Sequence, residues 1–304
     1  MKIMVFDVGG TEIKYSVMDE QMHRTNSGAV PTPQDTQAQF LDAVYRLYAP
    51  HKDEVSGIAM ALPGFVDNRT GYVSNGGALL YNTATPVGQL LAEKCGCPVI
   101  LENDGKAAAM AELANGALKD CCNAAVFIIG TGVGGGIIAN GQLVRGVHFT
   151  AGEYSFVNTN AEAWDAPDQN MACQCSTSNL LKWYRARKAL PEDAPLDGRS
   201  FFAAANAGEP EALEVLRRFC HAVAVQIYNL TVLLDVEKVA IGGISKQPLL
   251  LESLRSAYDG LYASRAGQAY MEGLPRCQIV PCAFSSEANQ VGVAAAYFEA
   301  MQKK

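Results

Sequence analysis

Two glycine-rich segments with nearby polar residues are the first candidates for chemistry. VFDVGGTEIKYSV (5–17) places Asp7 before Gly9, Gly10 and Thr11, and GTGVGGG (130–136) has five glycines within seven residues. Residues without a Cβ allow backbone N–H groups to converge on an anion, so each segment is a candidate phosphate loop. Asp7 beside the first loop could hold Mg²⁺ directly or through water. A tight turn alone needs fewer glycines, so the pair of loops favours the binding of one polyphosphate from two sides.

The second segment also fits the dinucleotide pattern G-x-G-x-x-G through Gly130, Gly132 and Gly135. That function needs a helix directly after the glycines, because the N-terminus of the helix holds the pyrophosphate. The sequence continues instead with IIANGQLVRG, in which Asn140-Gly141 signals a hairpin turn. The pattern therefore argues against a nicotinamide dinucleotide, and the Lys-Ser/Thr ending of a P-loop is absent from this segment too.

Acidic and amide side chains follow in LENDGKAAA (101–109) and TAGEYSF (150–156). Asp104 is either the N-cap of a helix or a general base that takes the proton of an attacking hydroxyl. Asn103 beside it can donate to and accept from a second hydroxyl. Glu153 is either a surface charge or an acceptor for two adjacent sugar hydroxyls. We interpret Lys106 as a solvated residue at the start of the helix.

The elements that must position these residues form two similar halves. Short strands at 2–6, 13–18 and about 25–30 precede helical segments, and helix-forming residues run from 105 to 118. The pattern of strand, glycine turn and strand repeats at 124–146, and helical segments follow at 178–190 and 211–234. We therefore expect an α/β protein with one domain of residues 1–118 plus a returning helix at 288–304. Residues 119–287 would form the second domain.

Composition narrows the class of protein. The 304 residues carry a formal net charge of −7, with 49% hydrophobic and 18% charged residues. This is typical of a globular protein, and the acidic balance argues against a nucleic-acid partner, which needs a basic face. No run approaches the roughly 20 apolar residues of a membrane span, and the first residues do not resemble a signal peptide. Nine cysteines without a secretory signal predict reduced thiols in the cytoplasm.

Six segments in a fixed order give the sequence a resemblance to a known family. They are DVGGT (7–11), LPGFVD (62–67), ENDGKAAA (102–109), GTGVGGG (130–136), AGE (151–153) and IGGIS (241–245). Over essentially its whole length the chain resembles the ROK family of sugar kinases, within the actin-like ATPase superfamily. The resemblance implies two actin-like (ribonuclease H-like) domains, each a mixed sheet with flanking helices, around an interdomain cleft.

The same resemblance implies the transfer of the γ-phosphate of ATP, with Mg²⁺, to a sugar hydroxyl. Matched by position, Asp104 is the catalytic base. The residues expected to contact phosphate or metal are Asp7, Gly9, Gly10, Thr11, Gly130, Thr131 and Gly132. Those expected near the adenosine are Gly242 and Gly243, and those expected to hold the sugar are Gly64, Asn103 and Glu153. A homodimer is common among the relatives, and the resemblance implies one here.

The chain departs from the zinc-bearing members of the family. Those members carry Gly-His where this chain has Ser155 and Phe156, and a motif C-x-C-G-x-x-G-C where this chain reads CQCSTSNLL. Cys173 and Cys175 alone cannot complete a tetrahedral site, so we predict no zinc. An apolar ring at Phe156 would tolerate an aglycone or a second sugar. Together with LPGFVDNRTGYVSNGGALLYN (62–82), this makes the chain similar to zinc-less bacterial β-glucoside kinases.

The sequence favours a β-glucoside or hexose kinase that acts on the 6-hydroxyl, and four other functions are alternatives to it. A glucokinase or an N-acetylmannosamine kinase of the same family shares nearly all these motifs. A sugar-responsive repressor of the family would need a helix-turn-helix before the first hairpin, which begins at residue 3. A non-catalytic sensor of sugar or nucleotide would be favoured by loss of Asp104 or of the glycine loops, and these are intact.

Overall fold

Strand β1 (Lys2–Val8) lies at the centre of the first sheet, and its side chains face two helical layers. Met4, Phe6 and Val8 belong to one buried cluster, whereas Ile3 and Val5 belong to another. Because successive side chains of a strand point to opposite faces, both faces of this sheet are covered. The structure is a computed structural model that describes residues 1–302.

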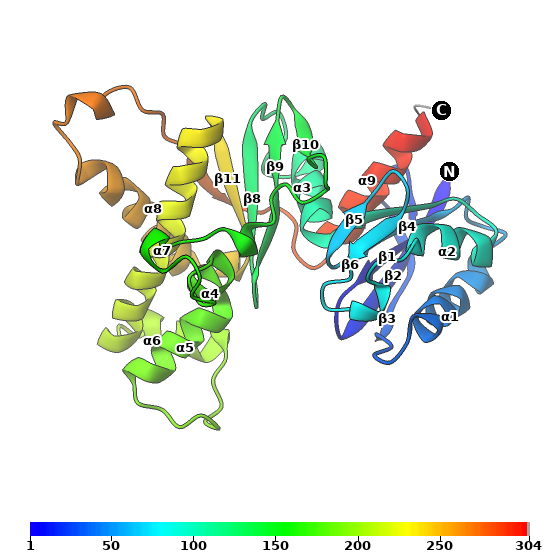
Figure 1. Ribbon diagram of the computed structural model, residues 1–304, viewed down its shortest axis with the longest axis horizontal. Coiled ribbons are helices and arrows are strands. Elements are labelled where there is room, and N and C mark those ends of the chain that lie inside the picture. Colours follow the sequence, from blue (N-terminus) through cyan, green and yellow to red (C-terminus); the bar gives the residue numbers. More distant parts are fainter. Residues whose placement is uncertain (303–304) are drawn as a thin grey trace. The chain divides into compact units, whose positions relative to one another are not determined.

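The chain divides into two compact units (Figure 1). Unit 1 comprises Met1–Lys119, Leu143–Ala151 and the C-terminal segment from Phe284, and unit 2 comprises Asp120–Gln142 and Gly152–Ala283. The sheet of unit 1 has the order β3-β2-β1-β4-β7, with β1–β2 and β2–β3 antiparallel and β1–β4 and β4–β7 parallel. Its other strands are β2 (Glu12–Asp19), β3 (Arg24–Pro31), β4 (Ile58–Leu62) and β7 (Val99–Asn103), and a separate ribbon pairs β5 (Phe65–Asp67) with β6 (Tyr72–Asn75).

Helices α1 (Gln37–Tyr48) and α2 (Val87–Cys95) cover one face of this sheet, and α3 (Asp104–Asn115) and α9 (Ala288–Gln302) cover the other. The last helix was expected at 288–304, and residues 303–304 lie outside the described part of the chain. A side chain at Gly292 of α9 would collide with the carbonyl group of Ala107 in α3. Helices α3 and α9 therefore pack at very short range through this glycine.

Unit 2 repeats the strand pattern of unit 1. Its sheet has the order β10-β9-β8-β11-β12, with β8–β9 antiparallel and β8–β11 and β11–β12 parallel. The strands are β8 (Ala124–Ile129), β9 (Val133–Ala139), β10 (Gln142–Val144), β11 (Lys238–Gly243) and β12 (Gln278–Pro281). The helices are α4 (Met171–Cys175), α5 (Thr177–Arg187), α6 (Gly198–Asn206), α7 (Pro210–Leu234) and α8 (Pro248–Ala263). The predicted α/β class, with a mixed sheet and flanking helices in each half, is confirmed.

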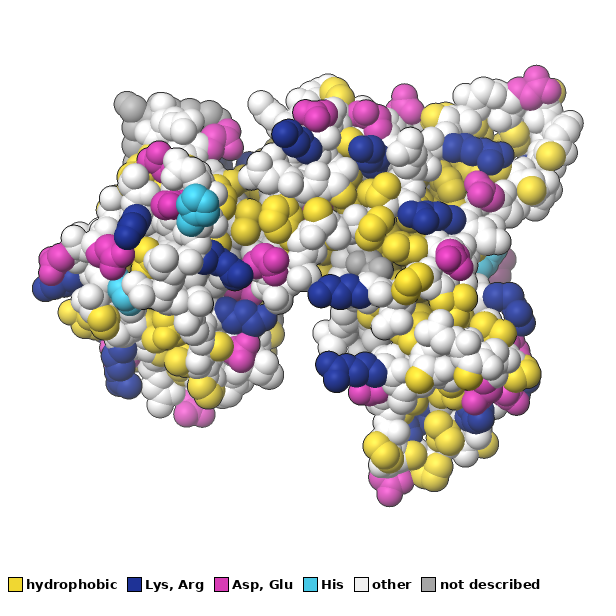
Figure 2. Space-filling model, turned by 180° about the vertical axis from the view of Figure 1, so that it is seen from behind, with side chains coloured by type: hydrophobic (Ala, Val, Ile, Leu, Met, Phe, Trp, Pro, Cys, Tyr) yellow, Lys and Arg dark blue, Asp and Glu magenta, His cyan; other side chains and the backbone are white. Residues whose placement is uncertain are grey.

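The surface is mixed in charge on the face that Figure 2 draws, where Lys and Arg side chains are interspersed with Asp and Glu. Within residues 1–302, no helix combines the length and the hydropathy that crossing a bilayer requires. All nine cysteines are unpaired, as the sequence predicted.

Candidate active site

The carboxyl ends of three neighbouring parallel strands bring together the predicted residues of unit 1. Asp7 of β1 pairs in register with Ala61 of β4, and Leu62 at the end of β4 pairs with Asn103 at the end of β7. Gly64 follows β4 by two residues, and Asp104 follows β7 directly. Ligands of open α/β sheets bind at this edge, outside the carboxyl ends of the strands.

Asp7 is held by the last helix. Its Oδ1 accepts a hydrogen bond from Nδ2 of Asn289 in α9 at 2.9 Å. Burial raises the pKa of Asp7, and the bond to Asn289 opposes this rise. Two side chains also hold the turn after Asp7. The carbonyl of Gly9 accepts a hydrogen bond from Thr32 Oγ1 (2.8 Å), and the carbonyl of Gly10 accepts one from Gln34 Nε2 (2.7 Å).

This environment of Asp7 fits a magnesium ion that arrives with a nucleotide. Mg²⁺ is usually bound by one or two carboxylates together with substrate phosphates and water. Among residues 1–302, no cluster of three or more His, Cys, Asp or Glu side chains is placed to hold a metal ion by itself. A cation beside Asp7 would stabilise its ionised form, which burial disfavours.

Asn103 organises the junction of β7 and α3. Its Oδ1 accepts from the Lys106 N–H (3.0 Å) and so caps α3, while its Nδ2 donates to the carbonyl of Gly64 (2.9 Å) and to Asp104 Oδ1 (3.1 Å). The interpretation of Asp104 as the N-cap is wrong, because Asn103 is the cap and Asp104 is the first helical residue. Asp104 therefore lies in the first turn of α3, the end of a helix where the dipole favours a negative charge.

Asp104 is fixed from a second direction too, since its Oδ1 also accepts from the Gly105 N–H at 2.7 Å. The expectation of a solvated Lys106 is wrong: its exposed fraction is 1%, and every residue from Gly105 to Glu112 is buried. Helix α3 therefore has no solvated face over this length. The Lys106 side chain is enclosed within unit 1, on the helix that begins with Asp104.

Gly64 has a conformation that only glycine adopts easily. Its φ is +93°, and a Cβ there would collide with the carbonyl oxygen of Asn75. The glycine thus allows the chain at 75–77 to pass close by while its own carbonyl meets Asn103.

In unit 2, the two predicted nucleotide segments lie at the ends of adjacent parallel strands. Gly130 follows β8, and Gly242 and Gly243 end β11, where they pair with Ile128 and Ile129. The turn is braced internally, since the Gly130 N–H donates to the Gly132 carbonyl (3.0 Å) and the Gly130 carbonyl accepts from the Thr177 N–H (2.8 Å). Thr131 lies at the exposed tip of this turn.

Part of the glycine richness has a structural cause. Gly135 lies in β9 with a φ of +144°, and a Cβ there would collide with the Val126 carbonyl and crowd the Tyr154 ring. The Tyr154 hydroxyl donates to the Gly136 carbonyl at 3.0 Å. The number of glycines alone is therefore weaker support for phosphate binding than the sequence indicated, and the argument depends on Gly130 to Gly132.

Glu153 precedes the short helix η3 (Tyr154–Phe156) of unit 2. Ser155, which stands where zinc-bearing relatives have glycine, accepts from the Val133 N–H (3.1 Å) and donates to its carbonyl (3.0 Å). This places the Glu153 segment against the strand that follows the Gly130 turn. Phe156 is 71% exposed.

The segment with Cys173 and Cys175 lies in α4. Burial raises the pKa of Cys175 to about 12. The prediction of no zinc stays a prediction.

A comparison with known families decides the assignment. The model of the ROK family matches residues 3–301. The chain belongs to the ROK family. The recognition of a ROK family sugar kinase from its six motifs is confirmed.

Individual ROK relatives are similar over most of the chain. A β-glucoside kinase of Listeria innocua is 30% identical, with 84% of this chain and 87% of the relative covered. An N-acetyl-D-glucosamine kinase of Vibrio atlanticus is also 30% identical, with 82% and 86% covered. The crystal structure of a ROK family protein of Streptococcus pneumoniae in complex with sucrose has a TM-score of 0.87 and 28% identity, and it covers 100% of both chains.

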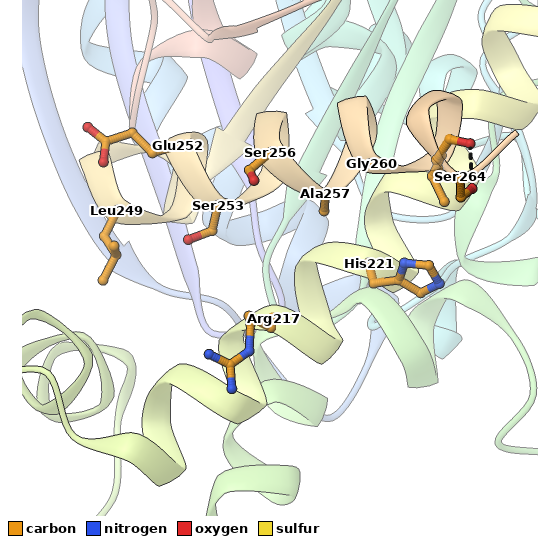
Figure 3. A pocket seen from close by; sticks show the side chains of 10 residues that line it. Arg217, His221, Leu249, Glu252, Ser253, Ser256, Ala257, Gly260 and Ser264 are labelled. Atoms are coloured by element: carbon orange, nitrogen blue, oxygen red, sulfur yellow. Dashed lines mark hydrogen bonds between the residues drawn. The ribbon is translucent and has the colours of Figure 1, made fainter. Parts of the chain in front are cut away.

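Unit 2 also has a groove that lies away from the predicted sugar and nucleotide residues. A groove of about 700 Å³ runs along α8 from Leu249 to Ser264 and faces Arg217 and His221 of α7 (Figure 3). None of the described residues that line it belongs to the predicted sugar or nucleotide set.

Sequence reasoning missed one contact to a predicted site residue and one contact to the neighbour of another. Asn289 holds Asp7 from 282 positions away, and Arg145 pairs with Glu102 beside Asn103. No local pattern marks either residue, because each acts through a contact between distant parts of the chain.

Proposed function

We propose that this ROK protein transfers the γ-phosphate of ATP to the 6-hydroxyl of a hexose or β-glucoside. The observation that carries the proposal is the shared edge of β1, β4 and β7, which gathers Asp7, Gly64, Asn103 and Asp104. Among these, Asp104 is the carboxylate that two hydrogen bonds orient in the first turn of a helix. That arrangement supports a general base.

In the proposed reaction, Asp104 accepts the proton of the sugar hydroxyl. The hydroxyl oxygen forms a bond to the γ-phosphorus while the bond from this phosphorus to the bridging oxygen of ATP breaks, and ADP leaves. Gly64, Asn103 and Glu153 hold the sugar in this proposal. Mg²⁺ at Asp7 would neutralise charge on the phosphates.

The nucleotide would be held by the glycine turns of the two units. We assign the phosphates to Gly9, Gly10 and Thr11 in unit 1 and to Gly130, Thr131 and Gly132 in unit 2. The adenosine is assigned to Gly242 and Gly243. The braced turn after β8 and the neighbouring end of β11 support this assignment, since both lie at the carboxyl edge of the sheet.

A β-glucoside is favoured over a free hexose by the exposed ring of Phe156. This ring is three residues after Glu153 and offers an apolar surface for an aglycone or second sugar. The similarity to a β-glucoside kinase, and to a protein that binds the disaccharide sucrose, supports the same choice. An N-acetylhexosamine is the second candidate, supported by the N-acetyl-D-glucosamine kinase relative.

Three accompanying assignments are proposals as well. The unpaired cysteines support a cytoplasmic location. Residues 1–118 with the last helix, and residues 119–287, are proposed as the two functional domains. The protein is proposed to act as a homodimer.

The test is ADP release from the purified protein with ATP, Mg²⁺ and a panel of sugars. The panel contains glucose, cellobiose, aryl β-glucosides, sucrose, N-acetylmannosamine and N-acetylglucosamine. We expect the largest kcat/KM with a β-glucoside, and a preference for free glucose or an N-acetylhexosamine would contradict that choice. Binding of ATP without turnover of any sugar would favour a non-catalytic sensor.

A further inference from the structure

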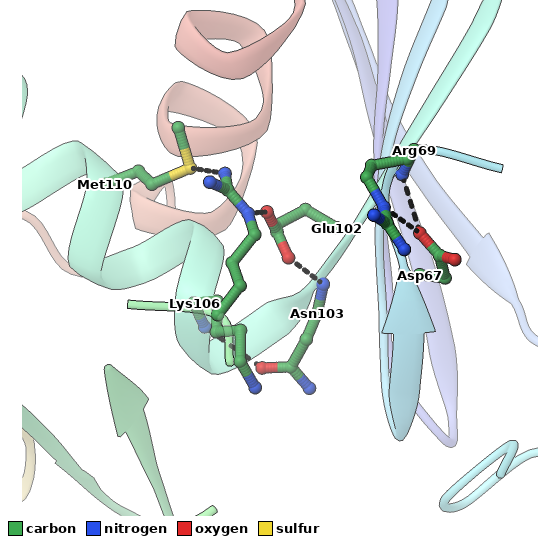
Figure 4. Close-up of polar contacts among 7 residues, drawn as sticks. Asp67, Arg69, Glu102, Asn103, Lys106 and Met110 are labelled. Carbon is green, nitrogen blue, oxygen red and sulfur yellow. Dashed lines mark hydrogen bonds and ion pairs between the residues drawn. The ribbon is translucent and has the colours of Figure 1, made fainter. Parts of the chain in front are cut away.

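A partly buried ion pair adjoins the proposed sugar and base residues of unit 1, with Arg145 27% and Glu102 1% exposed. Glu102 of β7 is 1% exposed, and its Oε2 accepts from Arg145 Nε at 2.8 Å. Its other oxygen, Oε1, accepts from the backbone N–H of Asn103 at 3.1 Å (Figure 4). One end of this buried carboxylate is therefore fixed by a cation, and the other end fixes the backbone of Asn103.

Fold stability alone does not explain this pair. Removing the Glu102 carboxylate from water costs several kcal/mol by general estimate, and an apolar side chain of similar volume often stabilises a fold equally well. A carboxylate kept inside a β-strand next to Asn103 is therefore better explained by what it holds in place.

The contacts continue from Asn103 to Asp104. The Asn103 side chain caps α3, meets the Gly64 carbonyl and donates to Asp104 Oδ1 at 3.1 Å. Arg145 thus connects through Glu102 and Asn103 to the proposed base. The positions of Asn103 and Asp104 matter for catalysis, because a displacement of about 1 Å can lower the rate of a reaction by roughly a hundredfold.

Arg145 also begins the segment that leads to Glu153. It directly follows β10, and its carbonyl accepts from the Ala151 N–H at 3.2 Å, which closes residues 145–151 into a loop. This loop has a second anchor in unit 1, where the Arg69 guanidinium lies 4.8 Å from the centre of the Phe149 ring. Arg69 is an exposed residue that pairs with Asp67.

We propose that Arg145 is a positioning residue for phosphoryl transfer, acting through Glu102 on Asn103 and Asp104. By the same bond it ties the loop that precedes Glu153 to the strand that carries Asn103. This inference rests on the proposed kinase function.

The test compares Arg145→Met with Arg145→Lys and with the control Arg69→Met. Arg145→Met should lower kcat/KM for the sugar roughly tenfold to hundredfold and leave KM for ATP unchanged. Arg145→Lys keeps the charge and should recover part of this loss. Arg69→Met loosens the other anchor of the loop without touching Glu102, and should leave kcat/KM close to that of the wild type.

Loss of Arg145 also leaves a buried charge, so a double variant separates positioning from folding. Glu102→Gln with Arg145→Met removes that charge and should restore the thermal midpoint, Tm, while kcat/KM stays low. If activity returns together with Tm, or if Arg69→Met and Arg145→Met lower kcat/KM equally, the positioning role is refuted.

A readout without turnover keeps this inference distinct from the kinase proposal. Hydrogen exchange at the Asn103 amide should become faster in Arg145→Met and stay unchanged in Arg69→Met, because only the first variant frees the Glu102 carboxylate. Unchanged exchange in Arg145→Met would overturn the inference even in an active enzyme. A wild-type protein that turns over no sugar would refute the kinase function instead, and the exchange result would still decide whether Arg145 positions Asn103.

Discussion

Replacing Asn103 by alanine tests whether this residue joins the sugar-binding edge to the base. The change removes the cap of α3, which is worth about 1 kcal/mol. It also leaves the Gly64 carbonyl without the bond from Nδ2, which adds about 1 kcal/mol. The expected loss of about 2 kcal/mol corresponds to a decrease in Tm of roughly 4–8 °C for a unit of this size.

Thr36→Ala is the matched control. Thr36 caps α1 in the same unit by accepting from the Gln39 N–H, and it has no role in the proposed site. Its loss should lower the free energy of unfolding by about 1 kcal/mol and Tm by roughly 2–4 °C, with KM for the sugar unchanged. Both variants are measured by scanning calorimetry and by ADP release.

A third variant separates capping from sugar binding. Asn103→Asp keeps an oxygen that accepts from the Lys106 N–H, but it loses the amide donor to Gly64 and Asp104 and adds a negative charge beside Asp104. We expect a smaller decrease in Tm than for Asn103→Ala and an equal or larger loss of activity. The reasoning is refuted if Asn103→Ala lowers Tm no more than Thr36→Ala and leaves KM for the sugar unchanged.

Three further predictions concern the metal and the sugar. Because burial raises the pKa of Asp7, its ionisation destabilises the fold as pH rises from the unfolded-state pKa to the raised folded-state pKa. Asp7→Asn should therefore raise Tm relative to the wild type by an amount that grows over this pH range and then stays constant, while Mg²⁺-dependent turnover is lost. A Tm difference that shrinks with rising pH would contradict this sign. Glu153→Gln should weaken sugar binding far more than ATP binding in calorimetry, and equal losses would exclude Glu153 from the sugar site. Elemental analysis should find no stoichiometric zinc, and one zinc per chain would overturn the argument from Cys173 and Cys175.

Much of the fold could be predicted because its signals are local in the sequence. The hairpins at β1–β2 and β8–β9 follow from apolar strands that flank glycine turns. The parallel pairing of β1, β4 and β7 then sets their carboxyl ends side by side. The number of glycines in residues 130–136 was a less exact signal of phosphate binding. Gly135 is required by close packing against Val126 and Tyr154, and a sequence pattern cannot separate that cause from phosphate binding.

Contacts between distant segments could not be predicted. Asn289 meets Asp7, and Arg145 meets Glu102 beside Asn103, only because the fold returns a later segment to an earlier strand. The sequence predicts a solvated side chain for Lys106, because the start of an alanine-rich helix usually has an exposed face. In this protein α3 is covered on all sides from Gly105 to Glu112, so the alanines serve close packing as well as helix formation.

The measurement that tests the account most directly is the turnover of Asp104→Asn compared with its sugar binding. Asparagine keeps an oxygen that can accept from the Gly105 N–H and the Asn103 amide, so the local structure should persist. Loss of a general base predicts a decrease in kcat of roughly a hundredfold to ten-thousandfold, with sugar affinity by calorimetry close to that of the wild type. A variant that retains more than about a tenth of the wild-type rate would contradict the role of Asp104.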